Sequence, residues 1–215
     1  MSENTAIKIL IIDPHPIVHA GLKQMFSIFK DIEIVGQTTS GLEGIRLARQ
    51  LQFSMLMIEI ALIDKNGIEV IKQLKKEFPS ISIVVFSMLK EDQYAIRALK
   101  AGASGFIHKN STQEIVIGAV RQIASGLKFI SPSLAQEMAN NLNQEFENEP
   151  HKILSDREYQ TLIMIASGKS VSDIAKELSL SVKTISEYRA RILFKMKLRH
   201  NAEITHYAIK NQLVE

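Results

Sequence analysis

The clearest indication of the fold is the stretch Met55-Leu56-Met57-Ile58-Glu59-Ile60, followed by Ala61-Leu62-Ile63-Asp64-Lys65-Asn66-Gly67. Its first part is an apolar run that carries one carboxylate near its carboxyl end, and its second part ends in the polar residues Asp64-Lys65-Asn66 and a glycine. Such a run is typical of a strand that is buried on both faces of a parallel sheet. Ligand chemistry in these sheets belongs to the carboxyl ends of the strands, so Glu59 stands where a functional group is expected.

Short apolar runs and amphipathic stretches alternate along the first part of the chain. The predicted strands cover residues 7–12, 32–35, 55–60, 81–86 and 105–108. The predicted helices cover residues 17–29, 42–51, 68–78, 92–101 and 113–124. Strands that alternate with helices require crossover connections, which are right-handed and give a parallel sheet with helices on both faces. The pattern therefore predicts an α/β domain with a doubly wound, five-stranded parallel sheet.

Four polar residues lie at the carboxyl ends of these predicted strands. Asp13 follows the first strand, Glu59 the third, Ser87 the fourth and Lys109 the fifth. Together with Phe106, this set resembles the receiver domain of bacterial response regulators, in which an acidic pair binds magnesium and an aspartate accepts a phosphoryl group. The resemblance spans about residues 6–126 and includes Asp13-Pro14-His15-Pro16, Gly67, Gly102-Ala103 and the segment 106–109.

The chain departs from the receiver pattern at the positions that carry the chemistry. Pro14 replaces the second acid of the magnesium pair, Glu59 replaces the acceptor aspartate, and Ile63 replaces a loop proline. Losing one hard oxygen ligand lowers the expected affinity for magnesium. The longer glutamate side chain moves the attacking oxygen by roughly an ångström, and misplacement on that scale can cost on the order of a hundredfold in rate. We expect no efficient phosphoryl transfer.

Two readings of Glu59 stay open at this stage. In one, its carboxylate permanently imitates the phosphorylated aspartate by pairing with Lys109 or by drawing Ser87 inward. In the other, the site is vestigial and serves only folding. Ser87 and Phe106 match the hydroxyl and aromatic switch positions of the family, and their alternative role is ordinary packing.

Two further motifs suggest ligands but are not expected to bind them. His15 and His19 are four residues apart, a spacing that can hold zinc, but no third ligand of a suitable type is close in the sequence. The turn at residues 102–105 precedes a strand instead of opening a helix, so it is expected to cap a helix and not to cradle a phosphate. We predict no catalytic residue, no metal and no cofactor.

The 215 residues fit two modest domains, with 46% hydrophobic and 23% charged residues. We predict a receiver-like domain at 1–128, a linker with a helix at 134–142 over residues 129–150, and a second domain at 151–215. Cysteine is absent, which excludes disulfides and thiolate metal sites. No apolar stretch approaches the roughly 18 residues of a membrane helix, so a cytoplasmic protein without membrane contact is expected.

The charge is unevenly divided between these domains. Residues 1–150 hold 15 Lys and Arg against 16 Asp and Glu, which gives −1. Residues 151–215 hold 11 against 7, which gives +4, and the excess lies between Lys183 and Arg199. A small basic domain is the electrostatic pattern of a nucleic-acid binder, although a solvated helix can look the same.

The sequence of the second domain predicts a small all-α bundle with a helix-turn-helix. Ser155 and Glu158 have the spacing of a capping box, Ser167-Gly168 ends the first helix, and Ser170 or Ser172 can cap the next. A third helix follows Ser181, with an inner face predicted to consist of Val182, Ile185, Ile192, Leu193 and Met196. Two helices joined by a short turn, the second basic on its exposed side, are typical of a helix-turn-helix.

Residues 178–186 resemble the DNA-binding domain of the NarL/FixJ/LuxR regulators, and the resemblance covers about residues 153–214 with a final helix at 202–211. It implies that Lys183, Thr184 and Glu187 face base edges in the major groove. It makes Ser181, Arg189, Arg191, Lys195 and Lys197 candidates for phosphate contacts. Tyr188 departs from the commoner histidine, which puts one contact in doubt.

These observations predict a sequence-specific transcription regulator of two-component type that works without phosphorylation. A homodimer is expected, because one small domain covers only half of a two-fold operator. The last helix offers a contact face through Ile204, Tyr207, Ala208 and Asn211, unless that stripe only closes the bundle. The alternatives are a regulator controlled by phosphorylation at a divergent acceptor and an interaction module that sequesters a signalling partner at the receiver. A third alternative is a weak acyl phosphatase, for which the metal site is incomplete.

Overall fold

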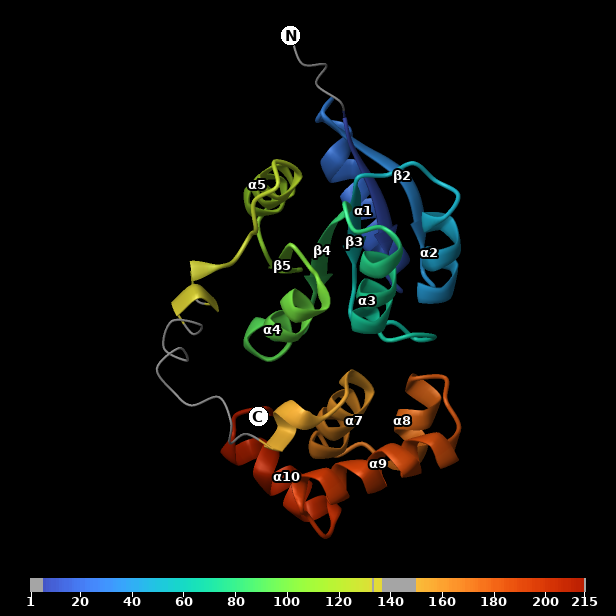
Figure 1. Cartoon of the computed structure of the whole chain (residues 1–215), viewed down its shortest axis with the longest axis vertical. Helices are drawn as coiled ribbons and strands as arrows, with labels where there is room; N and C mark the ends of the chain where they lie inside the picture. Colours follow the sequence, from blue (N-terminus) through green and yellow to red (C-terminus); the bar gives the residue numbers. More distant parts are fainter. Residues whose placement is uncertain (1–5, 133, 137–149, 215) are drawn as a thin grey trace. The chain divides into compact units, whose positions relative to one another are not determined.

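The computed structural model describes residues 6–132, 134–136 and 150–214. The chain divides into two compact units, Met1–Asn140 and Asn141–Glu215, and each is described by itself. The first is a parallel sheet between helices and the second is a helical bundle (Figure 1). The predicted fold class is confirmed.

The sheet of the first unit has the strand order β2-β1-β3-β4-β5, and every neighbouring pair is parallel. Its strands are β1 (Ile7–Ile12), β2 (Ile32–Thr38), β3 (Met55–Ile58), β4 (Ser82–Ser87) and β5 (Gly105–His108). The central strand β3 is buried along its whole length, as its apolar run predicts.

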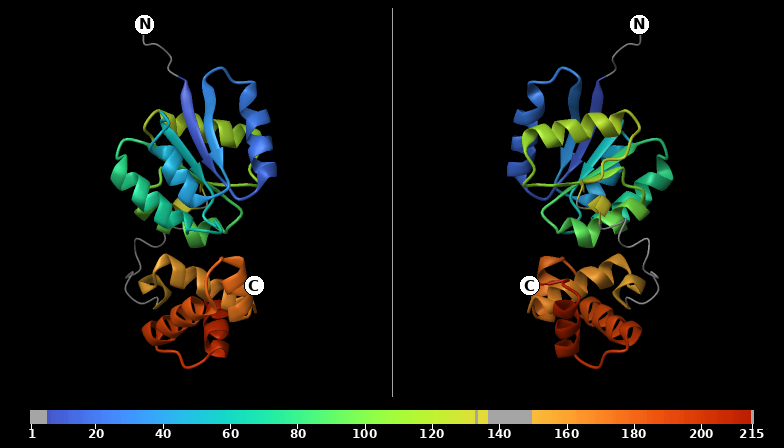
Figure 2. Two further views of the ribbon diagram at one scale, coloured as in Figure 1. Left: turned by 90° about the vertical axis from the view of Figure 1, so that its right-hand side faces the viewer. Right: turned by 90° about the vertical axis from the view of Figure 1, so that its left-hand side faces the viewer.

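Helices cover both faces of this sheet (Figure 2). They are α1 (Pro16–Ser27), α2 (Gly41–Ala48), α3 (Gly67–Glu77), α4 (Glu91–Ala101) and α5 (Gln113–Ala124). On one face, Leu22 and Phe26 of α1 and Val116 and Val120 of α5 pack with alternate strand residues in one core. The helices α2, α3 and α4 lie together on the other face. The carboxyl ends of the strands lie together at one edge of the sheet, where functional groups are expected.

The predicted and observed bounds differ by a few residues, and the difference at β3 bears on the site. This strand ends at Ile58 and not at residue 60, because the chain turns there and the backbone N–H of Ile60 donates to the carboxylate of Glu59 at 2.7 Å. The turn is tight. A Cβ on Gly67 would lie 2.4 Å from the backbone oxygen of Glu59, so this loop requires glycine. The strand β2 is three residues longer than predicted and reaches Thr38.

The predicted linker lies mostly outside the described residues. Pro132 and residues 134–136 are helical, in agreement with the start of the predicted helix at 134–142. The remainder of that helix and the acidic stretch at 143–149 belong to the part that is not described. The predicted domain boundaries at residues 128 and 150 stay predictions.

The second unit consists of a 3-10 turn and four helices in its described residues. These are η1 (Pro150–Ile153), α7 (Asp156–Ala166), α8 (Val171–Glu177), α9 (Val182–Met196) and α10 (Asn201–Lys210). Tyr159, Leu162 and Ile174 are among its buried core residues. The capping box is present, because the Ser155 hydroxyl accepts from the Glu158 N–H while the Glu158 carboxylate accepts from the Ser155 N–H.

Buried apolar residues define the inner faces of α9 and α10. Ile185, Ile192 and Met196 form the inner face of α9, but Val182 is 51% exposed and was wrongly placed there, because it is the first helical residue and lies beyond the reach of the core. In α10, Ile204 and Ala208 are fully buried. They close the bundle and are not free for a partner.

Candidate functional site

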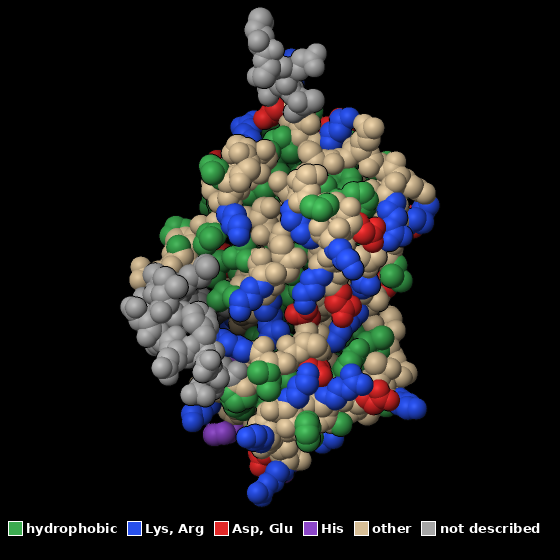
Figure 3. Space-filling view, in the orientation of Figure 1, with side chains coloured by type: hydrophobic (Ala, Val, Ile, Leu, Met, Phe, Trp, Pro, Cys, Tyr) green, Lys and Arg blue, Asp and Glu red, His purple; other side chains and the backbone are tan. Residues whose placement is uncertain are grey.

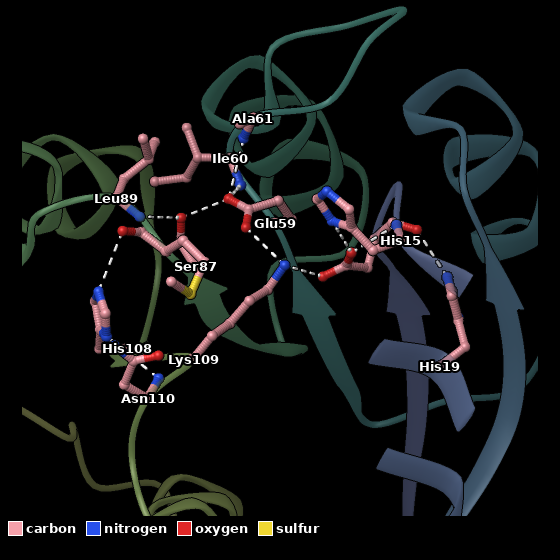
Figure 4. Close-up of polar contacts among 12 residues, drawn as sticks. His15, His19, Glu59, Ile60, Ala61, Ser87, Leu89, His108, Lys109 and Asn110 are labelled. Carbon is pink, nitrogen blue, oxygen red and sulfur yellow. Dashed lines mark hydrogen bonds and ion pairs between the residues drawn. The ribbon is translucent and has the colours of Figure 1, made fainter. Parts of the chain in front are cut away.

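The ends of four strands bring the predicted receiver residues together. Asp13 follows β1, Glu59 follows β3, Ser87 ends β4 and Lys109 follows β5. We call these four residues the strand-end cluster. Its members are almost completely buried, with exposed side-chain fractions of 3% for both carboxylates and 7% for Lys109. Figure 4 shows Glu59, Ser87 and Lys109 pointing toward one another.

Glu59 makes four contacts within this cluster and its loop. Its Oε1 accepts hydrogen bonds from the Ser87 hydroxyl at 2.5 Å, from the Ile60 N–H at 2.7 Å and from the Ala61 N–H at 3.1 Å. Its Oε2 lies 2.8 Å from Lys109 Nζ. Both oxygens are thus occupied by donors of the protein itself. Charge-assisted hydrogen bonds of this kind are among the stronger ones in proteins.

Lys109 also pairs with the second carboxylate. Its Nζ lies 2.6 Å from Asp13 Oδ2, so one ammonium group bridges two buried carboxylates. The other oxygen of Asp13 accepts from the His15 N–H at 2.9 Å and lies 3.0 Å from His15 Nδ1. The three formal charges leave one net negative charge, which these donors stabilise.

A divalent cation does not fit this arrangement. Magnesium needs several oxygen ligands in near-octahedral geometry. The ammonium of Lys109 lies within 2.8 Å of both carboxylates that would have to supply them. Among the described residues, no group of three His, Cys, Asp or Glu side chains could hold a metal ion. His19, one of the pair with zinc spacing, instead contacts the backbone oxygen of Asp13 through Nε2 at 2.7 Å.

The cluster continues into the loop after β4. The Ser87 hydroxyl accepts from the Leu89 N–H at 3.1 Å, while His108 Nδ1 accepts from the Asn110 N–H at 3.2 Å. This leaves His108 Nε2 to donate to the backbone oxygen of Met88 at 3.1 Å. Phe106, on β5, is 1% exposed. The Ser87 hydroxyl points toward Glu59 (Figure 4), and Phe106 is buried, so both residues of the predicted switch are turned inward.

Sequence reasoning missed two sets of polar contacts in the first unit. The contact between His15 and Asp13 has the two-residue spacing of an Asx turn, a signal that was available in the sequence. Asp64 was missed because its partners lie far away in the chain: it accepts from Ser40 Oγ, the Gly41 N–H and the Leu42 N–H, which start α2. Burial raises the pKa of Asp64, but these hydrogen bonds outweigh burial and hold that pKa below its ordinary value.

The second predicted site lies on α8 and α9. Each helix is capped by the hydroxyl of the residue before it, Ser170 accepting from the Asp173 N–H and Ser181 from the Thr184 N–H. Lys183, Glu187 and Arg191 are exposed on α9, as are Ser181 and Lys197 at its two ends. Figure 3 shows blue Lys and Arg side chains on the visible face of this unit, with green hydrophobic ones between them.

Several of the predicted DNA-contacting side chains have partners inside the unit or are partly covered by it. Arg189 Nε donates to Asn201 Oδ1 at 2.5 Å, and Arg191 lies 3.9 Å from Glu187. The side chains of Thr184 and Tyr188 are half-buried. These contacts limit the directions in which the side chains can reach.

Among these basic side chains, Lys195 has the most buried partner. Its Nζ lies 2.6 Å from Oε2 of Glu158, a carboxylate with a 3% exposed side chain on α7. Burial raises the pKa of Glu158, but the hydrogen bonds from Lys195 and Ser155 outweigh burial and lower that pKa below its ordinary value. Lys195 therefore ties α9 to α7, a role that sequence reasoning missed.

Comparison with known families matches both units. The model described as "Response regulator receiver domain" matches residues 9–121, and the model described as "Bacterial regulatory proteins, luxR family" matches residues 152–208. None of the helices in the described residues is both long and apolar enough to cross a membrane.

Known proteins match this chain over nearly its whole length. The response regulator GacA of Pseudomonas aeruginosa is 31% identical over 97% of this chain and 98% of its own, and the response regulator UvrY of Escherichia coli strain K12 is 28% identical over 96% and 95%. Among solved structures, RcsB of Salmonella enterica serovar Typhimurium, bound to a promoter in the presence of the phosphomimetic BeF3−, is 25% identical with a TM-score of 0.60. The match covers 94% of this chain and 98% of that one. The chain thus belongs to the two-component response regulators that carry a DNA-binding domain of the luxR family.

Proposed function

We propose that this protein is a sequence-specific transcription regulator whose receiver unit holds its output conformation without accepting a phosphoryl group. The proposal rests on the ion pair and the hydrogen bonds of the Glu59 carboxylate. Its carboxylate is held by a lysine, a serine hydroxyl and two backbone N–H groups. A cation and several N–H or O–H donors are also what a phosphoryl group would need at this place.

The position of Ser87 favours the interpretation in which Glu59 imitates a phosphoryl group over the one in which the site is vestigial. A purely structural carboxylate could be neutralised by Lys109 alone. Here the hydroxyl of Ser87 also turns to Glu59 at 2.5 Å, and Phe106 is buried beside β4. A carboxylate carries one charge and two oxygens against about −1.5 to −2 and three oxygens for a phosphoryl group, so the imitation is partial.

Control by phosphorylation is less well supported. Every carboxylate oxygen of Asp13 and Glu59 has a donor from the protein, and Lys109 lies between them. Pro14 offers no side-chain ligand for a metal, so the incoming phosphoryl group would lack its usual counter-ion. We therefore assign catalytic function to none of these residues.

The output of the proposed regulator is DNA binding by α9. We assign Lys183, Thr184 and Glu187 to base edges and Ser181, Arg189, Arg191, Lys195 and Lys197 to phosphates, with Tyr188 between them. A homodimer on a two-fold site is part of the proposal, and the cytoplasm is its location because DNA is the proposed ligand. One related structure is described as two RcsB dimers bound to two parallel DNAs.

Genome-wide capture of DNA fragments by the full, unmodified chain tests the DNA-binding half. We expect enrichment of a two-fold motif without any phosphodonor. The matched variant Lys183→Ala should relax the motif at one position and weaken binding by about 1–3 kcal/mol. If the wild-type chain enriches no fragment over input, the regulator assignment fails and sequestration of a protein partner becomes the better account.

The variant Glu59→Gln tests the receiver half, because it keeps the shape of the side chain and removes its charge. If Glu59 imitates a phosphoryl group, the variant should lose at least about fivefold in affinity for the captured motif or in dimerisation. Sedimentation and fluorescence anisotropy on the full chain measure both. A variant that stays folded and binds like the wild type would identify the site as vestigial.

A further inference from the structure

Phe194 exposes an aromatic ring on the surface of α9. Its side chain is 87% exposed, the highest value among the large hydrophobic side chains of the described residues. A Phe side chain can bury 150 Å² or more, at roughly 25 cal/mol per Å², so leaving it in water forgoes a large stabilisation. Single exposed apolar residues are common, however, and exposure alone assigns nothing.

The position of Phe194 on the helix supplies the second observation. At 3.6 residues per turn, Phe194 lies about 180° around α9 from the buried residues Ile185, Ile192 and Met196. The same geometry places it on one line with Lys183, Glu187 and Ala190, all of which are exposed. Phe194 therefore belongs to the stripe that faces DNA in the proposed function.

The middle of this stripe allows close approach. Ala190, which lies between Glu187 and Phe194 on this stripe, is exposed and small, and the exposed Arg191 is turned about 60° around the helix from Phe194. The stripe itself therefore carries no long side chain between Glu187 and Phe194 that would hold the helix away from the floor of a groove. The major groove is about 12 Å wide and admits an α-helix. Glu187 on the same stripe would be repelled by phosphates, which favours base edges over the backbone as the opposing surface.

We propose that Phe194 packs against the C5-methyl group of a thymine in the major groove and selects that base in each half-site. This inference rests on the proposed function and extends it by one specificity-determining residue. The thymine methyl is the main apolar feature of the major groove edge, and aromatic contact with it is a known mode of readout. Phe194 lies about 16 Å along the helix from Lys183, so it reads a base pair several steps away.

Parallel selections from a random duplex library, with the full wild-type chain and the variant Phe194→Ala, test this inference. Both chains should select the same motif except at one thymine per half-site, where the variant loses its preference. The two chains should bind the unselected starting library with equal affinity. Lys183→Ala is the matched control and should lose preference at a different position. Because the ring is exposed, we expect the melting temperature of the variant to stay unchanged.

Replacing that thymine with deoxyuridine, which removes only the methyl group, isolates the contact. The wild-type chain should lose roughly three- to fivefold in affinity, the value of one buried methyl group, and Phe194→Ala should lose nothing. If both chains select identical motifs, or if Phe194→Ala changes only the oligomeric state, the inference is wrong while the regulator assignment stands. If the wild-type chain selects no motif, both fall.

Discussion

At the scale of single residues, the decisive group is the ammonium of Lys109. It lies 2.6 Å from Asp13 and 2.8 Å from Glu59, and all three side chains are buried. Moving three charges out of water is costly, and the attraction between them offsets this cost only while the set is complete. The cluster therefore stabilises the first unit only when all its members are present. It also fixes the orientation of the Glu59 and Ser87 side chains.

Replacing Lys109 with Met tests this dependence. The variant keeps most of the apolar stem and leaves two carboxylates buried without their cation, so the first unit should lose about 3–5 kcal/mol in free energy of unfolding. Hydrogen exchange of the amides in β3, followed by mass spectrometry, reports this unit separately. The exposed Lys100→Met on α4 is the control and should stay within about 0.5 kcal/mol of the wild type. A loss below about 1 kcal/mol in Lys109→Met would contradict the account.

The acceptor chemistry gives a second prediction at this scale. Glu59→Asp alone should not restore magnesium-dependent labelling by acetyl phosphate, because Pro14 still supplies no ligand. The double variant with Pro14→Asp should be labelled more efficiently, since it completes the acidic pair with Asp13. Intact mass spectrometry measures the labelled fraction. Equal labelling of the single and double variants would show that the second acid is not what limits the chemistry.

At the scale of elements, the ion pair between Lys195 and Glu158 joins α9 to α7. The hydrogen bonds that lower the pKa of Glu158 outweigh the burial that raises it, so this pKa lies below its ordinary value of 4.5. The stability that Glu158 contributes is therefore fully present above about pH 4.5 and is lost as the pH falls through the lowered pKa. Lys195 positions the proposed recognition helix as well as carrying charge.

Lys195→Met should lower the free energy of unfolding of the second unit by about 1–2 kcal/mol at neutral pH, a modest value because a third of the Lys195 side chain is exposed to solvent. The difference from the wild type should shrink as the pH falls below 4.5 and Glu158 becomes protonated. Hydrogen exchange of α7 and α9 amides against pH measures it. The exposed Lys210→Met is the control. A difference that is independent of pH would show that Lys195 acts through packing alone.

At the scale of the whole molecule, the sequence was sufficient for the fold because its periodicities are local. The apolar run at 55–58, the capping box at Ser155 and the cap at Ser181 each depend on neighbours within a few residues. The grouping of Asp13, Glu59, Ser87 and Lys109 also followed, since parallel strands end at one edge of their sheet.

The contacts of the individual side chains could not be predicted in the same way. The resemblance made Lys195 a candidate for a phosphate contact, but its long stem allows the ammonium to reach Glu158, 37 residues away in the sequence. Asp64 reaches Ser40 and the N-terminus of α2 across a similarly long stretch. Such contacts depend on how distant elements pack, and a pattern within one element does not encode them.

Independence from phosphorylation is tested by measuring the affinity of the full chain for its captured DNA motif with and without acetyl phosphate and magnesium, with intact mass recorded on the same samples. The account predicts unchanged mass and affinities that agree within about twofold. The double variant Pro14→Asp, Glu59→Asp serves as the positive control for labelling. A stoichiometric phosphoryl adduct on the unmodified chain, accompanied by a rise in affinity of about fivefold or more, would contradict it.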